Sequence, residues 1–172
     1  MRILITTAAL VYSLTLTGCG FFGSGRAASA AQLAALEIQA KEGGYGLIKP
    51  AELFELVSTR QNMILIDATP DDHFREHHIL GATNYVFPNT KWTPAWDATG
   101  SGGKSPEDYQ RQLGRDASLT VIVYEEDGDS QRGHLAAAWA KKLGYPNVRR
   151  LAGGIAAWQA AGYETRSLTE EK

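Results

Sequence analysis

Two patterns of apolar residues alternate along the chain from Tyr45 to Tyr163. Short apolar runs of strand length are interspersed with longer segments whose apolar residues recur at helical spacing. The predicted strands are Met63–Asp67, a strand within Ile79–Phe87, Leu119–Tyr124 and Asn147–Leu151. Three helices are predicted in the first half of the chain: Ala30–Glu42, a helix from Pro50 with Leu53, Phe54 and Val57 buried, and a short helix from Thr69 or Pro70 to His77. Three more are predicted in the second half. They are a helix that begins at Ser105-Pro106, a helix with Leu135, Trp139 and Leu143 on one face, and a last helix with Ile155 and Trp158 inward. Strands that alternate with helices predict an α/β domain with a parallel sheet and helices on both faces.

The stretch Leu119–Tyr145 combines a strand, a polar loop and a helix. The first backbone N–H groups of such a helix point into the loop, where they and the helix dipole favour negative charge. The acidic residues of this loop are Glu125, Glu126, Asp127 and Asp129. Asp67 also follows a predicted strand, and ligands of parallel sheets bind beyond the carboxyl ends of the strands. The acidic loop and Asp67 are therefore predicted to share the candidate site.

Composition narrows the class of protein. A chain of 172 residues with 44% hydrophobic and 21% charged residues has room for one globular domain and a tail. The formal net charge of −2 gives no electrostatic basis for binding nucleic acid. The single cysteine excludes an intrachain disulfide and a zinc site built from several cysteines.

Residues 1–18 have the features of an export signal. Arg2 supplies a positive start, and the apolar run Ile3–Leu16 is short for a membrane span. The sequence Leu16-Thr17-Gly18-Cys19 resembles the lipobox of bacterial lipoproteins, and an ordinary secretory signal is the alternative. The resemblance implies acylation at Cys19, attachment to a membrane of the cell envelope and, because Gly20 follows the cysteine, the periplasmic side of an outer membrane where the cell has one.

The remaining chain divides into three parts. Residues 19–44 are predicted to form a lipid-anchored tether that includes the helix Ala30–Glu42, which ends at Gly43-Gly44. Whether this helix docks on the domain is open. Residues 45–165 form the domain, and residues 166–172 form a polar tail.

Four elements together resemble the rhodanese-like domain family. They are Ile64–Asp67, His78-Ile79-Leu80-Gly81-Ala82, Leu143-Gly144-Tyr145 and Leu151–Trp158, which includes the run Gly153-Gly154-Ile155. The resemblance implies a single domain with a central parallel sheet of about five strands. Active members carry a cysteine directly after the central strand, in a loop like C-x-x-G-x-R-S, and that thiolate accepts and donates sulfur.

This chain departs from the family at the cysteine. Aligned from the strand, the cysteine position falls on Glu125, and Gly128 matches the loop glycine; aligned from the helix, it falls on Asp127, and Arg132 matches the loop arginine. The degenerate loop, which comprises Glu125, Glu126, Asp127, Gly128, Asp129, Ser130 and Arg132, offers no thiol, so no catalytic residue is expected. The family's D-x-R element is Asp67-Ala68-Thr69 here, and His78 matches a family position that we interpret as structural, hydrogen-bonded to the backbone.

Several interpretations of the acidic loop and its surroundings remain. The leading one places Glu125 in the amide cradle as a permanent imitation of the persulfide, and the alternative is that the loop carboxylates bind a cation. His73 and His77 are spaced to share a metal, although surface positions explain them more simply. His134, the one titratable base next to the loop, is a candidate binding residue and is expected to be exposed to solvent. No cofactor is expected.

Trp92 and Trp96 lie in the polar, glycine-containing insertion Pro88–Lys104. They either bind a partner or pack back onto the domain. The hypothesis that follows is a lipid-anchored, non-catalytic binding or scaffolding module for an envelope protein. The alternatives are an enzyme that uses non-thiol chemistry or a partner's cysteine, and a metal-handling lipoprotein.

Overall fold

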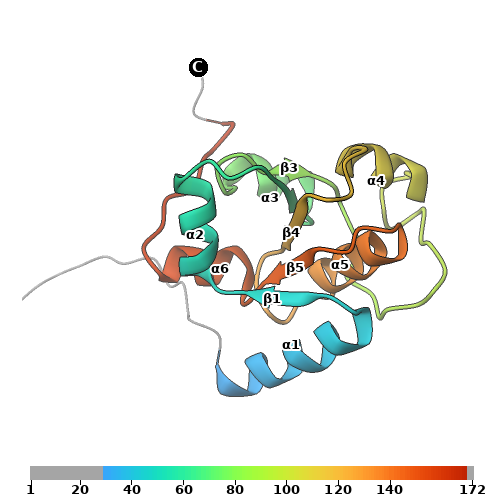
Figure 1. The fold of residues 1–172 in the computed structure, drawn as a ribbon, viewed down its shortest axis with the longest axis horizontal. Helices are drawn as coiled ribbons and strands as arrows, with labels where there is room; N and C mark the ends of the chain where they lie inside the picture. The colour runs from blue at the N-terminus through green and yellow to red at the C-terminus, as the bar shows by residue number, and fades with distance from the viewer. Residues whose placement is uncertain (1–28, 170–172) are drawn as a thin grey trace, which may run out of the picture.

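The computed structural model describes residues 29–169, and these residues are built around a five-stranded parallel sheet (Figure 1). The strands are β1 (Gly46–Ile48), β2 (Met63–Asp67), β3 (Thr83–Asn84), β4 (Thr120–Tyr124) and β5 (Val148–Leu151). Their order across the sheet is β1-β5-β4-β2-β3, and every pair is parallel. The predicted α/β class with a central sheet of five parallel strands is confirmed.

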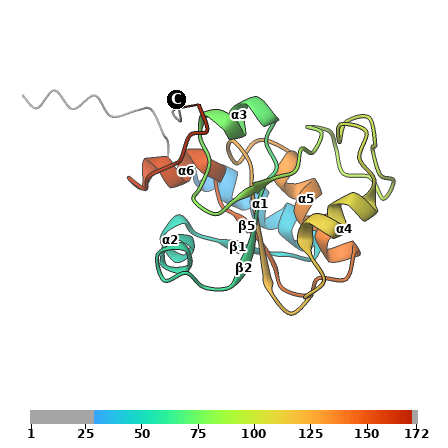
Figure 2. The same ribbon diagram turned by 90° about the horizontal axis from the view of Figure 1, so that it is seen from above.

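Helices cover both faces of the sheet (Figure 2). They are α1 (Ala30–Gly43), α2 (Pro50–Ser58), α3 (Asp71–Glu76), α4 (Pro106–Leu113), α5 (Arg132–Lys142) and α6 (Gly154–Ala160). Side chains alternate along β4, so that Val121 and Val123 pack in the core beneath α1, α4 and α5, whereas Ile122 and Tyr124 pack in the core beneath α2 and α6. The central strands are buried on both faces, as parallel strands between two helical layers must be.

Local sequence signals account for most of the element boundaries. Ser105 caps α4 through a capping box with Asp108, and Pro106 occupies the first helical turn. Gly44 ends α1 in a left-handed conformation, with φ of 71°.

Two predictions at the level of elements were wrong. The short edge strand β1 was not predicted, since three residues carry too little alternation to be recognised. Phe54 was predicted to be buried, yet 41% of its surface is exposed, because Leu53 is the residue of α2 that faces the core.

Helix α1 packs on the domain, next to α5 and β1 (Figure 1). Leu36 is fully buried, and Ala40 is buried in the core beneath α5. Gln39 accepts a hydrogen bond from Arg150, and Gln32 donates one to Asp129. The helix that the sequence assigned to the tether is therefore in contact with β5 and with the acidic loop.

Within residues 29–169, no helix is long and apolar enough to cross a membrane. The predicted signal peptide, Cys19 and the first part of the tether lie outside the described residues, as do the last three residues of the predicted tail.

Candidate functional site

The acidic loop connects β4 to α5 at the carboxyl end of the sheet, where parallel sheets bind ligands. Glu125 is the first residue after β4, and Arg150 lies on the neighbouring strand β5. Asp67 ends β2 on the other side of β4. The structure thus brings Asp67 and the acidic loop to the same edge of the sheet, as the sequence predicted.

A buried ion pair between Glu125 and Arg150 occupies the centre of the site. Both side chains have no exposed surface. Arg150 donates from Nε and Nη2 to Glu125 Oε1 at 2.9 and 2.5 Å, and Nη2 also donates to the Ser130 carbonyl at 2.8 Å. Its Nη1 donates to Gln39 Oε1 of α1 at 2.5 Å. Every nitrogen of the guanidinium is therefore engaged, and Arg150 joins β5 to the loop and to α1.

The surroundings of Glu125 act on its ionisation in opposite directions. Burial raises the pKa of Glu125 and outweighs the charge and hydrogen bonds of Arg150, which lower it, so that the pKa is about 7. Glu125 Oε2 is buried and has no hydrogen-bond partner among the described residues. Arg150 is therefore the one group that strongly offsets the cost of burying the charge of Glu125.

Two glycines make space for this carboxylate and its backbone. A Cβ at Gly133, in the first turn of α5, would lie 1.6 Å from Glu125 Oε2. A Cβ at Gly154 would lie 2.4 Å from the Glu125 carbonyl oxygen, which accepts a hydrogen bond from Ile155 N at 2.8 Å. Gly154 also has φ of 61°, a conformation suited to glycine. The Gly153-Gly154 pair therefore lets α6 approach the loop closely.

Backbone amides of the loop are occupied by Asp127, not by Glu125. Asp127 Oδ1 accepts hydrogen bonds from the amides of Asp129 and Ser130 at 3.0 and 3.1 Å. The prediction that Glu125 lies in the amide cradle was therefore wrong. Glu125 binds Arg150 instead, because the guanidinium carries a full positive charge whereas the backbone amides of the loop carry only partial charges.

The outer side of the loop carries a second charged group. Glu126 Oε1 lies 3.3 Å from Arg132 Nε and 3.7 Å from His73 Nδ1. Arg132 also donates to the Phe87 carbonyl. Gly128 packs on Leu36 of α1, since a Cβ there would lie 3.4 Å from Leu36 Cδ1. One side of the loop thus faces α1, and the other presents Glu126 with its partners.

Asp67 is buried beside the loop and is held by its own turn. Its Oδ1 accepts hydrogen bonds from Thr69 N and Oγ1 at 2.8 and 2.5 Å, and Oδ2 has no partner among residues 29–169. Burial raises the pKa of Asp67, and the Thr69 hydrogen bonds oppose that change. Thr69 therefore provides hydrogen bonds to Asp67 from the position where the D-x-R element has its arginine.

His134 is buried, and the prediction that it is exposed was wrong. Its exposed fraction is 1%, because the first turn of α5 lies under Tyr45 and Trp92. The Tyr45 hydroxyl lies 2.8 Å from Nδ1, and Nε2 has no partner in the described part of the chain. Burial lowers the pKa of His134, and the positive charge of Arg150 acts in the same direction. His134 is thus a neutral base enclosed next to the ion pair.

The other predicted histidines lie outside this centre. His78 Nδ1 is 2.9 Å from the Phe74 carbonyl oxygen, and its ring stacks on Phe74. His73 faces Glu126, and His77 follows the end of α3. Among the described residues, no group of three or more metal-ligating side chains is placed to hold an ion.

Trp92 and Trp96 pack back onto the domain. The two rings lie 6.0 and 4.9 Å from the ring of Trp139, centroid to centroid, and Trp96 also contacts Phe87. Trp96 Nε1 donates to the Lys104 carbonyl at 2.7 Å. Of the two alternatives left open by the sequence, the packed arrangement is the one observed.

Sequence reasoning did not identify Arg150, Gln39, Tyr45 or Gly133 as parts of the site. One signal was available for Arg150. In the strand Val148–Leu151, positions of one parity face one side of the sheet, so Val148 and Arg150 point the same way. An arginine on the core-facing side of a buried strand requires an acidic partner, and the acidic loop is adjacent.

The fold and the position of the loop define an α/β protein whose site lies at the carboxyl end of a five-stranded parallel sheet. The chain belongs to the rhodanese-like domain family, whose model matches residues 49–161. The match begins after β1, so α1 is additional to the matched region.

The chain is also similar to a curated protein in sequence and to solved structures in fold. The chain is 29% identical over 111 residues to the adenylyltransferase and sulfurtransferase UBA4 of Candida albicans, a match that covers 64% of this chain and 23% of that protein. A protein from Bacillus halodurans shares the fold with a TM-score of 0.56 and 20% identity, over 79% of this chain and 86% of the other. Thiosulfate sulfurtransferase from Pseudomonas aeruginosa has a TM-score of 0.54 and 20% identity, over 79% of this chain and 23% of that one.

We expect the buried ion pair to be strongly coupled to stability. At pH 8, Arg150→Met leaves the Glu125 carboxylate buried without its cation, and Glu125→Leu leaves Arg150 without its anion. Each variant should lose about 3–5 kcal/mol of unfolding free energy in urea denaturation, and the double variant should lose clearly less than the sum of the two.

Arg149→Met is the matched control on the same strand. Arg149 pairs with Glu52 at 2.8 Å and donates to the Leu47 carbonyl, but 39% of its side chain and 48% of that of Glu52 are exposed, so the loss should stay within about 1 kcal/mol. An Arg150→Met variant as stable as Arg149→Met would show that the pair does not stabilise the fold.

The depressed pKa of His134 predicts a dependence of stability on pH. Below its ordinary pKa of 6.5, the unfolded chain binds a proton that the folded chain does not, so the His134 contribution falls as the pH falls. Glu125 acts oppositely between about pH 7 and its unfolded pKa of 4.5, because its folded pKa is raised. The contribution of His134 is therefore measured as the difference in unfolding free energy between the wild type and His134→Gln from pH 8 to pH 5. As the pH falls below 6.5, the wild type should lose unfolding free energy relative to His134→Gln. A difference that stays constant from pH 8 to pH 5 would contradict the prediction.

Proposed function

We propose that this protein is an envelope lipoprotein whose rhodanese-like domain is a non-catalytic binding module. The observation that carries the proposal is the Glu125–Arg150 pair directly after β4, at the first position of the loop in which active relatives would carry their cysteine. A carboxylate cannot accept or release a sulfane sulfur, because the transfer needs a thiolate nucleophile.

Three features of the loop support the loss of sulfur transfer. Residues 45–172 contain no cysteine. Asp127 accepts hydrogen bonds from two loop amides that would otherwise be free for a bound anion. Arg150, the cation nearest to the loop start, is already paired with Glu125. An anionic substrate would therefore meet carboxylates and no free positive charge at the inner side of the loop.

The surface available for binding is the outer side of the same loop. Glu126, Arg132 and His73 form a polar group there, in which the Glu126 side chain is 27% exposed, and Asp129 lies at its edge next to α1. Charged side chains at the rim of an interface select partners more than they add affinity. We propose that a protein of the cell envelope docks on this group. Protein recognition would then take place at the edge of the sheet where active relatives would bind substrate.

Anchoring at Cys19 would place this surface close to a membrane. About ten residues separate Cys19 from Ser29, which is a span of at most about 35 Å when fully extended. Attachment by two or more acyl chains is stable, whereas a single chain gives marginal binding. The partner is accordingly sought among proteins of the same membrane.

We expect no sulfurtransferase activity from the chain purified in detergent. With thiosulfate as donor and cyanide as acceptor, thiocyanate formation should equal that of buffer, because the described domain has no thiol at the site. Thiosulfate sulfurtransferase from Pseudomonas aeruginosa is the positive control, assayed in the same detergent. Turnover by this chain above the buffer rate would overturn the non-catalytic part of the proposal.

We expect crosslinking in intact envelopes to capture a protein partner that depends on the outer side of the loop. Glu126→Gln combined with Asp129→Asn should remove the crosslinked partner, because it removes two outer carboxylates and leaves Glu125 intact. Glu55→Gln, at an exposed position of α2, is the control and should retain the partner.

Fractionation of the same envelopes tests the anchor. Cys19→Ser should move the protein from the membrane fraction to the soluble fraction. Crosslinks unaffected by the loop substitutions would move the interface away from the loop, and a Cys19→Ser variant that stays in the membrane fraction would contradict the anchor.

A further inference from the structure

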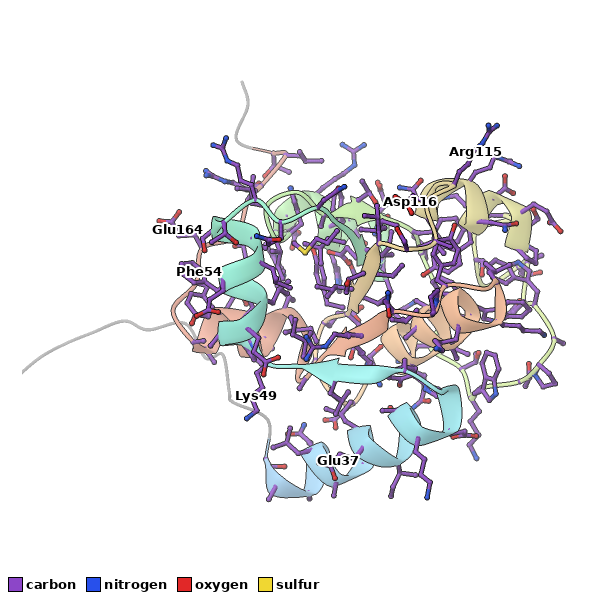
Figure 3. The ribbon with its side chains drawn as sticks, viewed as in Figure 1. Glu37, Lys49, Phe54, Arg115, Asp116 and Glu164 are labelled. Carbon is purple, nitrogen blue, oxygen red and sulfur yellow. The ribbon has the colours of Figure 1, made fainter. Side chains whose placement is uncertain are left out.

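A second concave surface lies between α2 and α6, on the sheet face opposite α1 and α5. This groove, here called the α2–α6 groove, has a volume of about 580 Å³. Its walls are formed by Phe54, Val57, Leu80, Trp158 and Tyr163, and its rim by Arg60, Glu164 and Arg166. Figure 3 shows Phe54 and Glu164 on the same side of the molecule, away from Arg115 and Asp116. The volume is within the range of small-molecule sites.

The walls of the groove are aromatic and partly exposed. Phe54 stacks on Tyr163 with ring centroids 4.3 Å apart and an interplanar angle of 8°, and Tyr163 lies 4.9 Å from Trp158. Phe54 is 41% exposed, and Leu80 across the groove is 54% exposed. Large apolar side chains that gather in a concavity, with polar groups at the rim, mark binding sites more often than ordinary surface.

The rim carries two arginines, Arg60 and Arg166. Within residues 29–169, neither Arg60 nor Arg166 forms an ion pair or a side-chain hydrogen bond. Glu164 is the one acid among the lining residues, so the rim has a net positive charge. An unpaired guanidinium at the edge of an apolar groove is suited to a carboxylate, which it can bind through two parallel hydrogen bonds.

The backbone at Arg60 gives independent support. Arg60 is the only non-glycine residue of the described chain with a positive φ, at 52°, and its amide donates to the Val57 carbonyl at 3.1 Å. A non-glycine residue in this region is strained, and glycine would fit at less cost. Backbone strain of this kind gathers at binding sites, and the Arg60 side chain lines the groove.

We propose that the α2–α6 groove binds an apolar carboxylate, a molecule with a hydrophobic body and one carboxylate group. The body lies against Phe54, Leu80 and Tyr163, and the carboxylate lies between Arg60 and Arg166. The groove is built from α2, α6, the chain segments that follow each of them, and Leu80 from the segment between α3 and β3. This site is therefore separate from the acidic loop and does not depend on the function proposed for that loop.

The proposal is tested with laurate as the probe, by isothermal titration calorimetry on the full chain with Cys19→Ser, which is expected to be soluble without detergent, and with laurate kept below its critical micelle concentration. We expect one laurate per chain. Dodecyltrimethylammonium, which has the same tail and the opposite charge, should bind at least tenfold more weakly. Arg60→Gln combined with Arg166→Gln should weaken laurate binding at least tenfold, and Leu80→Ser should weaken binding of both probes.

Arg111→Gln combined with Arg115→Gln is the control of equal charge, on and after α4 and away from the groove, and it should leave laurate binding unchanged. Should the Gln substitution at Arg60 lower stability, Arg60→Gly with Arg166→Gln removes the same charge and the backbone strain. Absence of laurate binding, equal binding of the cationic probe, or binding unchanged by the loss of both groove arginines would each overturn the proposal.

Discussion

The buried ion pair of Glu125 and Arg150 is the interaction on which the rest of the site depends. It joins β4 to β5, and through Gln39 and Ser130 it extends to α1 and to the end of the loop. Two charges without exposed surface are costly unless each has a close partner, so neither residue can change alone. The pair therefore constrains the space around it: Gly133 has to lack a side chain because Glu125 Oε2 lies where its Cβ would be.

The same pair explains why the family's fold persists without its thiol. In a sulfurtransferase the first residue of the loop has to remain reachable, because it exchanges groups with two substrates. Here that residue is directed toward Arg150 and covered by packing, so the loop is free to carry other surface chemistry. Asp127 stabilises the turn through two amides, and Glu126, with 27% of its side chain exposed, contacts Arg132 and His73 at the outer side of the loop. One acidic loop thus combines an internal charge, a turn and an outer ion pair.

Sequence reasoning recovered what local patterns encode. The apolar runs gave β2, β4 and β5, and the cap at Ser105 gave the start of α4 to the residue. What it missed depends on contacts between distant segments. Arg150 becomes an ion-pair partner only because β5 lies beside β4, and His134 is buried only because Tyr45 and Trp92 come from elsewhere in the chain to cover it. The loop position at the carboxyl end followed from topology, whereas the orientation of Glu125 required knowing which strand neighbours it.

The sheet ends on both sides in its shortest strands. β1 has three residues and β3 has two, and these are the two edges in the order β1-β5-β4-β2-β3. An edge strand exposes unpaired backbone groups that can recruit a strand from another molecule, and the hazard grows with its length. Edges this short offer almost no template for sheet extension between neighbouring molecules, so the topology of the domain itself protects it from strand-to-strand aggregation.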